Sequence, residues 1–277
     1  SGVSLRAVLI GLSMLLAFLS ISPVSAATPV SGTISSPETW TLASSPYTVT
    51  GNVTVASGAT LTIEPGVVVK FDSGKALQVQ GELVAQGTST STITFTSSAA
   101  SPAAGDWSYI QFTDSSTDAS FDGNGDYSSG SILEHVIVEY GGGVGVIGET
   151  GAVWSEGATP FITNSAFNHS LNNGVLLNAD SVFKFTDNYL SYNNLPVPVV
   201  HYGDVEGILL LQGTISTGSG TITVSGNTLE NNGHQNPQTV FVGTNYALYV
   251  NLNAPSVTTY ISNNSITENK SPHDASL

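Results

Sequence analysis

Asn188-Tyr-Leu-Ser-Tyr-Asn193, Asn227-Thr-Leu-Glu-Asn-Asn232 and Asn264-Ser-Ile-Thr-Glu-Asn269 are three copies of one short pattern. In each copy, an apolar residue stands three positions before the first Asn and another stands two positions after it. Ser165-Ala-Phe167 and His135-Val-Ile137 are weaker copies, which we place in the same register. The apolar flanks are Ile132, Ile162, Phe185, Val224 and Ile261 before the polar residue, and Ile137, Phe167, Leu190, Leu229 and Ile266 after it.

The copies follow one another at intervals of 30, 23, 39 and 37 residues. A recurrence of this length, with short alternating strands in every unit, predicts a coiling β-solenoid in which each unit packs on its neighbours. We therefore expect Leu229 and Ile266 to point into the interior from neighbouring coils.

Asn suits the corners of such coils. It tolerates the left-handed backbone of a sharp turn, and stacked amides form a ladder from coil to coil. We expect Asn227 to lie between Asn188 and Asn264 in such a ladder. The long intervals leave open a coil without the motif between two of them, and a role of these amides as sugar ligands is the functional alternative.

Residues 47–95 alternate between apolar and polar or small side chains, with Gly51, Gly58, Gly66, Gly81 and Gly87 between the runs. Runs of three to five residues separated by Gly predict many short strands rather than the longer strands of a sandwich. After residue 26 no long apolar period of 3.6 residues occurs. The sequence predicts an all-β fold.

Five further segments follow one another in a characteristic order: Leu61-Thr-Ile-Glu-Pro-Gly-Val-Val-Val-Lys-Phe71, Leu83-Val-Ala-Gln-Gly-Thr88, Ile93-Thr-Phe-Thr-Ser97, Gly105-Asp-Trp-Ser-Tyr-Ile-Gln-Phe112 and the stretch from Gly130 to Tyr140. These segments resemble secreted bacterial right-handed parallel β-helix repeat proteins with a pectate-lyase-like fold. The resemblance covers residues 45–270 and implies a right-handed parallel β-helix, a single-stranded β-solenoid. It does not fix the function, because this scaffold carries lyases, hydrolases, epimerases, tailspikes and adhesins.

Residues 1–26 read as a secretory signal peptide. Arg6 precedes the apolar run from Ala7 to Ile21, and Val24-Ser-Ala26 is a small-residue cleavage site. The run is short for a membrane span. We expect residues 27–277 to form one β-helix domain, truncated at both chain ends, without a membrane span after cleavage. Secretion without cysteine favours a secreted or extracellular cell-surface protein of bacterial origin.

The chain is acidic, with a formal net charge of −15, and only 9% of its residues are charged. Arg6 is its only arginine, and four lysines remain after the predicted cleavage. Nucleic acid and anionic membranes require clustered Lys and Arg, so we expect neither as a partner. A pectate-lyase reaction is also disfavoured, because it uses a cationic base and a polyuronate substrate.

Hydrolysis of a polysaccharide needs two carboxyl groups that face each other across the sugar. Glu134 with Glu139, and Asp204 with Glu206, are the close pairs along the chain. The signatures of polygalacturonases are absent, and Gly233-His-Gln235 is only a fragment of one. Both carboxylate pairs are equally consistent with solvated strand edges.

Asp122-Gly-Asn124-Gly-Asp126 is the best candidate metal site. Oxygen ligands at the first, third and fifth positions resemble the start of a calcium loop. The match then ends, because Leu133 stands where the bidentate Glu belongs. Asp114, Asp118 or Glu134 are candidates to complete the shell, and a polar excursion that uses these residues for turns is the alternative.

Trp40, Trp107 and Trp154 are candidate sugar-binding surfaces, with the covering of coil ends and loop bases as the alternative. Loops that interrupt the repeat at residues 98–131, 194–220 and 233–256 are the places where a binding site is built most easily. Together, the sequence favours a non-catalytic secreted or cell-surface protein, adhesin-like, with a structural, adhesive or carbohydrate-binding role. The partner expected is a polysaccharide or a cell-surface glycan. A carboxylate-dependent polysaccharide-active enzyme is the alternative.

Overall fold

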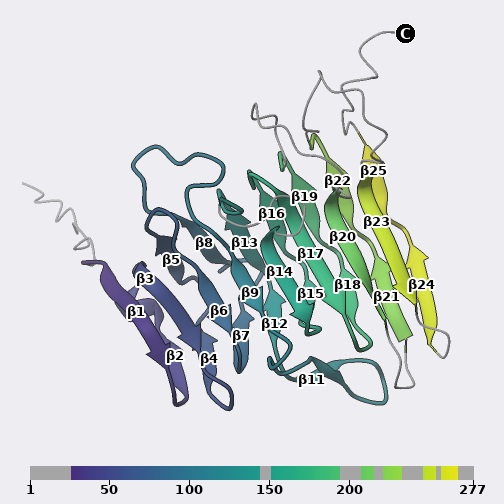
Figure 1. Ribbon diagram of the computed structural model, residues 1–277, viewed down its shortest axis with the longest axis horizontal. Coiled ribbons are helices and arrows are strands. Elements are labelled where there is room, and N and C mark those ends of the chain that lie inside the picture. Colours follow the sequence, from purple (N-terminus) through teal and green to yellow (C-terminus); the bar gives the residue numbers. More distant parts are fainter. Residues whose placement is uncertain are drawn as a thin grey trace, which may run out of the picture.

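The computed structural model describes residues 26–143, 151–193, 207–214, 221–232, 246–253 and 257–267. The chain winds around one long axis, and equivalent strands of successive coils pair in parallel to form three faces (Figure 1). The fold is an all-β right-handed parallel β-helix, as the sequence predicted. Eight strands form the second face, so the described residues make eight coils.

Each coil runs through the three faces in the same order. The first face consists of the second half of β3 (Tyr47–Val55), then β6 (Leu77–Val79), β9 (Ile110–Phe112), β14 (Gly151–Gly157), β17 (Asn173–Ala179), β20 (Gly207–Thr214) and β23 (Tyr246–Asn253). The second face consists of β2 (Glu38–Trp40), β4 (Thr60–Ile63), β7 (Glu82–Gln86), β12 (Ile132–Glu134), β15 (Phe161–Thr163), β18 (Lys184–Thr186), β21 (Thr221–Ser225) and β24 (Thr258–Ser262).

The third face begins with the first half of β3 and continues through β5 (Val68–Phe71), β8 (Ile93–Ser97), β13 (Val136–Glu139), β16 (Ala166–Asn168), β19 (Tyr189–Ser191), β22 (Thr228–Glu230) and β25 (Ser265–Thr267). β1 (Thr28–Ile34) pairs with both halves of β3. Two short strands, β10 (Ser120–Phe121) and β11 (Tyr127–Ser129), belong to none of the three faces and pair with each other. A 3-10 turn covers Leu42–Ser44.

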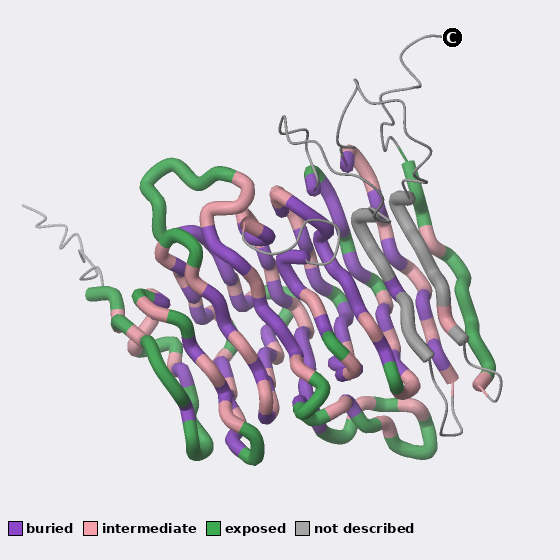
Figure 2. Tube along the Cα trace, in the orientation of Figure 1, coloured by how far each residue is buried: buried purple, intermediate pink, exposed green. Residues whose placement is uncertain are grey.

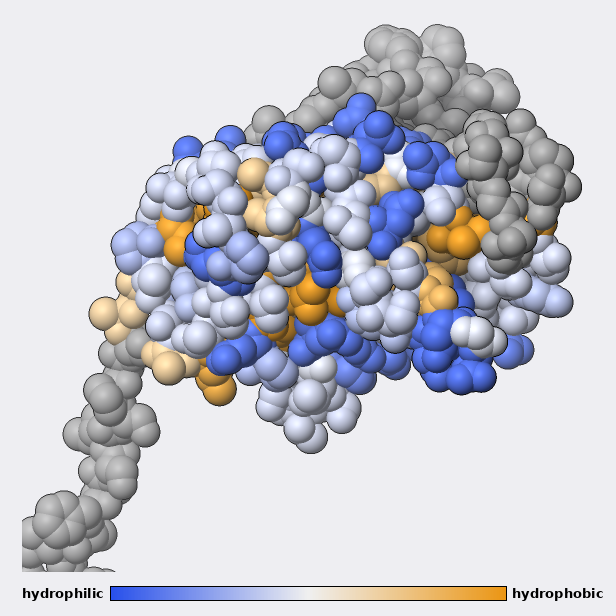
Figure 3. Space-filling model, turned by 90° about the horizontal axis from the view of Figure 1, so that it is seen from below, coloured by the Kyte–Doolittle hydropathy of each residue, from blue (hydrophilic) through white to orange (hydrophobic). Residues whose placement is uncertain are grey.

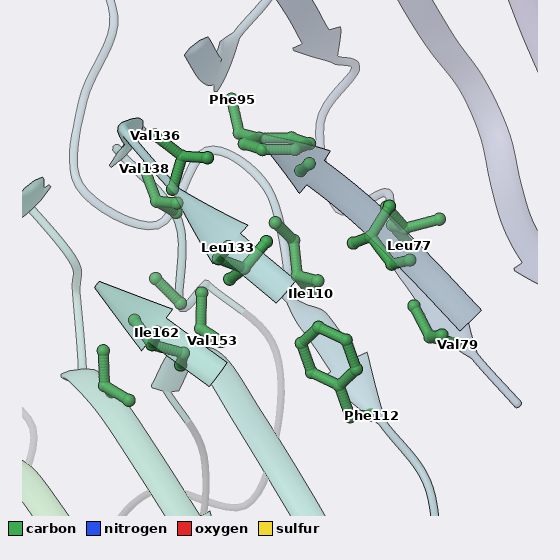
Figure 4. Packing of buried hydrophobic residues seen from close by; sticks show 14 of the residues in the cluster. Leu77, Val79, Phe95, Ile110, Phe112, Leu133, Val136, Val138, Val153 and Ile162 are labelled. Atoms are coloured by element: carbon green, nitrogen blue, oxygen red, sulfur yellow. The ribbon is translucent and has the colours of Figure 1, made fainter. Parts of the chain in front are cut away.

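The core is the interior of the coil. One residue parity of each strand points inward, and the other points to the outer surface. In β4, for example, Leu61 and Ile63 are buried, whereas Thr60 and Thr62, which alternate with them, are only half-buried. Side chains from all three faces meet inside (Figure 4). Figure 2 shows the alternation along the strands, together with largely exposed strands β1 and β24 at the two ends.

Left-handed backbone conformations mark the corners. Between the second and third faces, φ is 48–70° at His135, Asn164, Asp187, Gly226 and Asn263. A second set, Tyr140, His169, Tyr192 and Asn231, follows the third face with φ of 53–63°. In the sequence analysis we gave this conformation to the repeating Asn itself. In the structure, the residue before the repeating Asn has this conformation. The side chain of the repeating Asn instead makes hydrogen bonds to the backbone of the preceding coil.

The repeating Asn side chain fills the inside of the corner in the preceding coil. Asn227 Oδ1 accepts the backbone N–H of Asn188 at 3.0 Å, and its Nδ2 donates to the carbonyl of Phe185 at 3.0 Å. Asn264 does the same for Asn227 and the carbonyl of Val224. The predicted ladder is therefore confirmed, with Asn188 and Asn227 on adjacent coils. Asn188 and Asn227 are buried, which excludes these two as sugar ligands, whereas Asn264 in the last described coil is half-buried.

A second ladder, which the sequence analysis missed, follows the third face. Asn193 Oδ1 accepts the N–H of Ser170, and Asn232 Oδ1 accepts the N–H of Asn193, both at 3.0 Å. The Nδ2 groups donate to the carbonyls of Phe167 and Leu190. These Asn residues end the same six-residue copies, so the repeat encodes two corners rather than one.

The first copy of the repeat is displaced by one residue. Leu133, not Ile132, pairs with Ile162, and Val138, not Ile137, pairs with Phe167. His135 consequently matches the left-handed Asn164 rather than Ser165. The sequence register was wrong here because Ile132-Leu133 and Val136-Ile137-Val138 offer apolar residues in both parities.

Leu229 points inward and is fully buried, as predicted. Ile266 pairs with Leu229 on the neighbouring strand but is 49% exposed, so the prediction of its burial was wrong. It lies in the last coil of the described residues, where packing comes from one side.

The predicted signal peptide lies almost wholly outside the described residues and stays a prediction. In the part of the chain that the structure describes, no helix has the length and apolar character needed to cross a membrane.

Candidate functional site

The outer surface of the first face carries a hydrogen-bonded row of amides. Gln80 Nε2 donates to Gln78 Oε1 at 3.2 Å, and Gln78 Nε2 donates to Gln111 Oε1 at 2.8 Å. Gln111 Nε2 approaches Glu156 Oε2 at 3.4 Å. These four residues, here named the amide strip, project from β6, β9 and β14 or directly follow them. The strip crosses three coils because Gln78 and Gln111 are in register on parallel strands.

Two aromatic side chains adjoin the amide strip. Trp154 on β14 is the register partner of Gln111 on β9. Tyr109, which precedes β9, meets the Trp154 ring edge-on, with centroids 5.7 Å apart. Both rings are half-buried. Gln111 itself is buried, with 6% of its surface exposed, so the groups that an external ligand can reach are Gln78, Gln80, Glu156 and the two rings. Planar amides, one carboxylate and adjacent aromatic rings offer the polar and apolar groups that a small polar ligand requires.

The other two tryptophans are structural. Trp40 is buried and stacks on Tyr47 with centroids 4.9 Å apart, and Trp107 stacks on Phe71 at 4.2 Å. The Trp107 Nε1 donates to the carbonyl of Glu139 at 2.8 Å. Both belong to the buried core, so neither presents a face to a sugar.

Three carboxyl groups gather around Gly157, at the end of β14. A Cβ atom at Gly157 would lie 2.3 Å from Asp114 Oδ1, so the absent side chain leaves room for this carboxyl. Asp180 donates its backbone N–H to the carbonyl of Gly157 at 3.1 Å. Asp118 Oδ1 accepts the N–H of Thr159 at 2.7 Å. Asp114, Asp118 and Asp180 are here named the acidic trio.

The trio affects the titration of Asp180. Partial burial raises the pKa of this carboxyl above its ordinary value, and the charges of Asp118 and Asp114 raise it further. A carboxyl group that keeps its proton to higher pH next to ionised carboxylates is the arrangement used in acid–base catalysis, although structural clusters also produce it.

The sequence analysis missed Asp180 and did not connect it with Asp114. The signal was present, because Asp180 comes directly after β17 and Asp114 comes two residues after β9, and both strands belong to the first face. Only the register between β9, β14 and β17 places Asp114 beside Gly157 and Gly157 beside Ala179. That register depends on loops of unequal length.

The predicted calcium ligands lie at the tip of the β10–β11 hairpin. Asp122 Oδ1 accepts the backbone N–H groups of Asn124 and Asp126, both at 2.9 Å. These bonds hold the pKa of Asp122 below its ordinary value, with the bond to Asp126 contributing most. Within the described ranges, no group of three His or acidic residues is close enough to hold a metal ion. Asp114 and Asp118, named as further ligands, both lie in the acidic trio. Calcium binding stays a prediction.

The carboxylate pairs named for hydrolysis are not brought together in the described residues. Glu134 is on the outer second face, where Gln86 Nε2 donates to it at 3.1 Å. Glu139 is on the outer third face and accepts a bond from Thr96 at 2.8 Å. Asp204 and Glu206 lie outside the described residues.

The comparison with protein families gives one match to this scaffold. Residues 32–145 match the pectate-lyase-like β-helix domain family. The match spans the first four coils and includes Gln78, Gln111, Asp114 and Asp118, whereas Trp154, Glu156 and Asp180 lie beyond it. Together with the long parallel sheets, it confirms the resemblance to β-helix proteins of this fold. No curated protein and no solved structure matches the chain.

The pectate-lyase-like scaffold is compatible with a polysaccharide ligand, but the scaffold alone assigns no activity. Seen from below, the molecule presents mostly hydrophilic residues around small separate hydrophobic areas (Figure 3). Specific side chains, rather than a broad apolar surface, must therefore supply any function on this side.

Proposed function

We propose that this protein is a secreted or cell-surface β-helix that binds carbohydrate without catalysis, through the amide strip on its first face. The single observation that supports the proposal is the row from Gln80 to Glu156 beside Trp154 and Tyr109. Amide and carboxylate groups hydrogen-bond sugar hydroxyls, and aromatic rings contact the apolar faces of sugar rings. Secretion is supported by the charge and apolar pattern of residues 1–26.

The charge of the chain favours an uncharged glycan. Glu156 is the only charged residue of the amide strip, the acidic trio lies beside it, and the whole chain carries −15. A polyuronate would meet like charge at this surface, and such repulsion weakens association most at low salt. A neutral polysaccharide meets no such barrier.

Calorimetric titration with soluble neutral and anionic oligosaccharides tests the proposal. We expect a neutral oligosaccharide to bind, and the double variant Gln78→Ala/Gln80→Ala, which removes the two accessible amides of the strip, to lose about tenfold or more in affinity, the cost of one or two hydrogen bonds. Gln86→Ala, which removes a half-buried Gln from the outer second face, is the matched control and should bind normally. Equal affinity in the parent and the double variant would refute the role of the strip.

A second candidate, hydrolysis of a polysaccharide, is supported by one specific observation. The raised pKa of Asp180 suits a general acid, and Asp114 beside Gly157 is the candidate base. Release of reducing ends from a polysaccharide panel, abolished in Asp180→Asn but retained in the surface control Asp72→Asn, would support catalysis. No product from any polysaccharide with the parent protein would leave binding as the proposed function.

A further inference from the structure

Residues 114–131 interrupt the fourth coil between β9 and β12 and are here named the strap. Its outer half is a closed hairpin, in which Ser120 pairs with Ser129 and Phe121 with Tyr127. The N–H of Asp122 donates to the carbonyl of Asp126 at 2.8 Å and completes the tip. The strap contributes no strand to the three faces, and Figure 1 shows it along the lower edge of the solenoid.

The hairpin docks on the outer second face through aromatic rings. Phe121 meets Phe161 of β15 edge-on with centroids 5.2 Å apart, and Tyr127 stacks on the same ring at 6.2 Å. Burial, followed by the charges of Glu82 on the third coil and Glu134 on the fourth, raises the pKa of Tyr127 to about 12.

An apolar strip lies on the surface where the strap docks. Ile132 is in register between Val84 and Phe161, in the outward parity opposite to the inward Leu133. Ile132 is nevertheless fully buried, and it is not part of the inner core. An outward Ile with no exposed surface needs a cover, and we assign this cover to the hairpin, whose rings pack on Phe161, the register partner of Ile132.

One ammonium group holds the tip of the hairpin. Lys184 on β18 belongs to the sixth coil, two coils beyond the root of the strap. Its Nζ lies 4.4 Å from the centroid of the Phe121 ring and donates a hydrogen bond to the carbonyl of Gly125. A cation between an aromatic face and a carbonyl oxygen gains from both contacts, more so when it is partly desolvated, as here.

We propose that the hairpin of the strap undocks as a unit while the β-helix stays folded. Lys184 is the latch, the residue that holds the hairpin in its docked position. Undocking breaks contacts only between the hairpin and the outer second face, because the pairing of β12 with β7 and β15 does not involve residues 120–129. The open form exposes the strip of Val84, Ile132 and Phe161. Lys184 thereby controls whether this apolar strip faces water.

Hydrogen exchange followed by mass spectrometry tests the latch in the whole chain. In Lys184→Met, which keeps an apolar side chain of similar length, we expect the hairpin amides of residues 120–129 to exchange about tenfold faster than in the parent, the loss of one cation–π contact and one charged hydrogen bond. Amides of β4 and β7 should exchange as in the parent. Lys70→Met, which removes a half-buried lysine from the outer third face, is the matched control and should change nothing in the hairpin.

Two further measurements separate the latch from a general loss of stability. Phe121→Ala changes a residue of the hairpin alone and should also accelerate hairpin exchange, with an unchanged melting temperature of the β-helix. In Lys184→Ala, added ethylammonium should slow hairpin exchange again, whereas sodium chloride at equal ionic strength should not. Unchanged hairpin exchange in Lys184→Met, acceleration spread evenly over all coils, or equal rescue by sodium chloride would each overturn the proposal.

Discussion

Buried Asn side chains at the corners form hydrogen bonds with backbone groups that the turn leaves without a partner. A sharp turn leaves one backbone N–H and one C=O pointing inward, and burying either without a partner costs free energy. Asn offers an acceptor and a donor on one short planar group, so a single side chain satisfies both. Asn227 does this for the N–H of Asn188 and the carbonyl of Phe185.

Replacing Asn227 by Ala should therefore be costly. The change strands two buried backbone groups and removes the bond to Asn264, so we expect a loss of about 2–4 kcal/mol in the free energy of unfolding. Urea denaturation measures it. Asn168→Ala, which removes a half-buried surface Asn bonded to His169, is the control and should cost less than about 1 kcal/mol. Similar costs for both variants would contradict the ladder as the source of stability.

Asp180 should make stability depend on pH. Its folded-state pKa is raised by burial and by Asp118 and Asp114, so the protonated form favours folding. This contribution is fully present below the unfolded pKa near 4 and is lost as pH rises through the higher folded pKa. Asn carries no charge at any pH, so Asp180→Asn avoids the loss of stability that the ionised Asp180 causes at high pH. We therefore expect this variant to have a higher melting temperature than the parent at pH 7 but not at pH 3. A gain at pH 3 as large as the gain at pH 7 would contradict the raised pKa.

At the scale of residues, the sequence predicted the type of residue at the corners better than the position that has the left-handed backbone. It gave the ladder of Asn188, Asn227 and Asn264, because each Asn has apolar residues at fixed distances on both sides. It misplaced the left-handed residue, since Asn, Asp, Gly and His all occupy that position here and no single residue type marks it. Asp180 escaped notice because its partners approach it only across coils.

At the scale of the elements, the repeat located β15, β16, β18, β19, β21 and β22 from one pattern of ten apolar residues. The displaced fourth coil shows the limit of such a pattern. Where neighbouring residues of both parities are apolar, as in Ile132 and Leu133, the period alone does not tell the inner side from the outer side. The structure settles the parity, because Leu133 belongs to the inner core and Ile132 does not.

The β10–β11 hairpin carries the calcium prediction. If calcium binds at Asp122, Asn124 and Asp126, millimolar calcium should raise the melting temperature relative to chelator. The free energy of unfolding should increase by about 2.7 kcal/mol when calcium is in hundredfold excess over its dissociation constant. The increase should vanish in Asp122→Ala/Asp126→Ala. Glu38→Ala/Asp72→Ala removes the same charge elsewhere and should keep the increase. Identical melting curves of the parent in calcium and chelator would leave the hairpin closed by its own hydrogen bonds alone.

At the scale of the whole molecule, the β-helix is nearly one-dimensional, since each coil touches only its neighbours. The fold class follows from the sequence because the pattern recurs, and each copy places apolar residues at the inward-pointing positions of its strands. The site does not follow in the same way. The amide strip and the acidic trio each combine residues from several coils, and their meeting depends on loop lengths, such as the 18-residue strap between Thr113 and Ile132, that no periodicity encodes.

The one-dimensional architecture predicts that equivalent core residues contribute different amounts to the free energy of unfolding, depending on their position along the axis. Leu229 and Ile266 occupy the same register position on adjacent strands, but Leu229 is fully buried and Ile266 is 49% exposed. Leu229→Ala should cost about 2–5 kcal/mol, because it opens a cavity between two coils. Ile266→Ala loses roughly half of that transfer free energy and leaves no enclosed cavity, so it should cost about 1–2 kcal/mol.

Urea denaturation of both variants measures the difference, and hydrogen exchange locates it. Because coupling passes between neighbours, Leu229→Ala should accelerate exchange in β19 and β25 on either side, whereas Ile266→Ala should act on β22 and β25 alone. A cost of Ile266→Ala equal to that of Leu229→Ala would mean that Ile266 is enclosed in solution. In that case a further layer of chain or a second molecule would have to cover the last described coil.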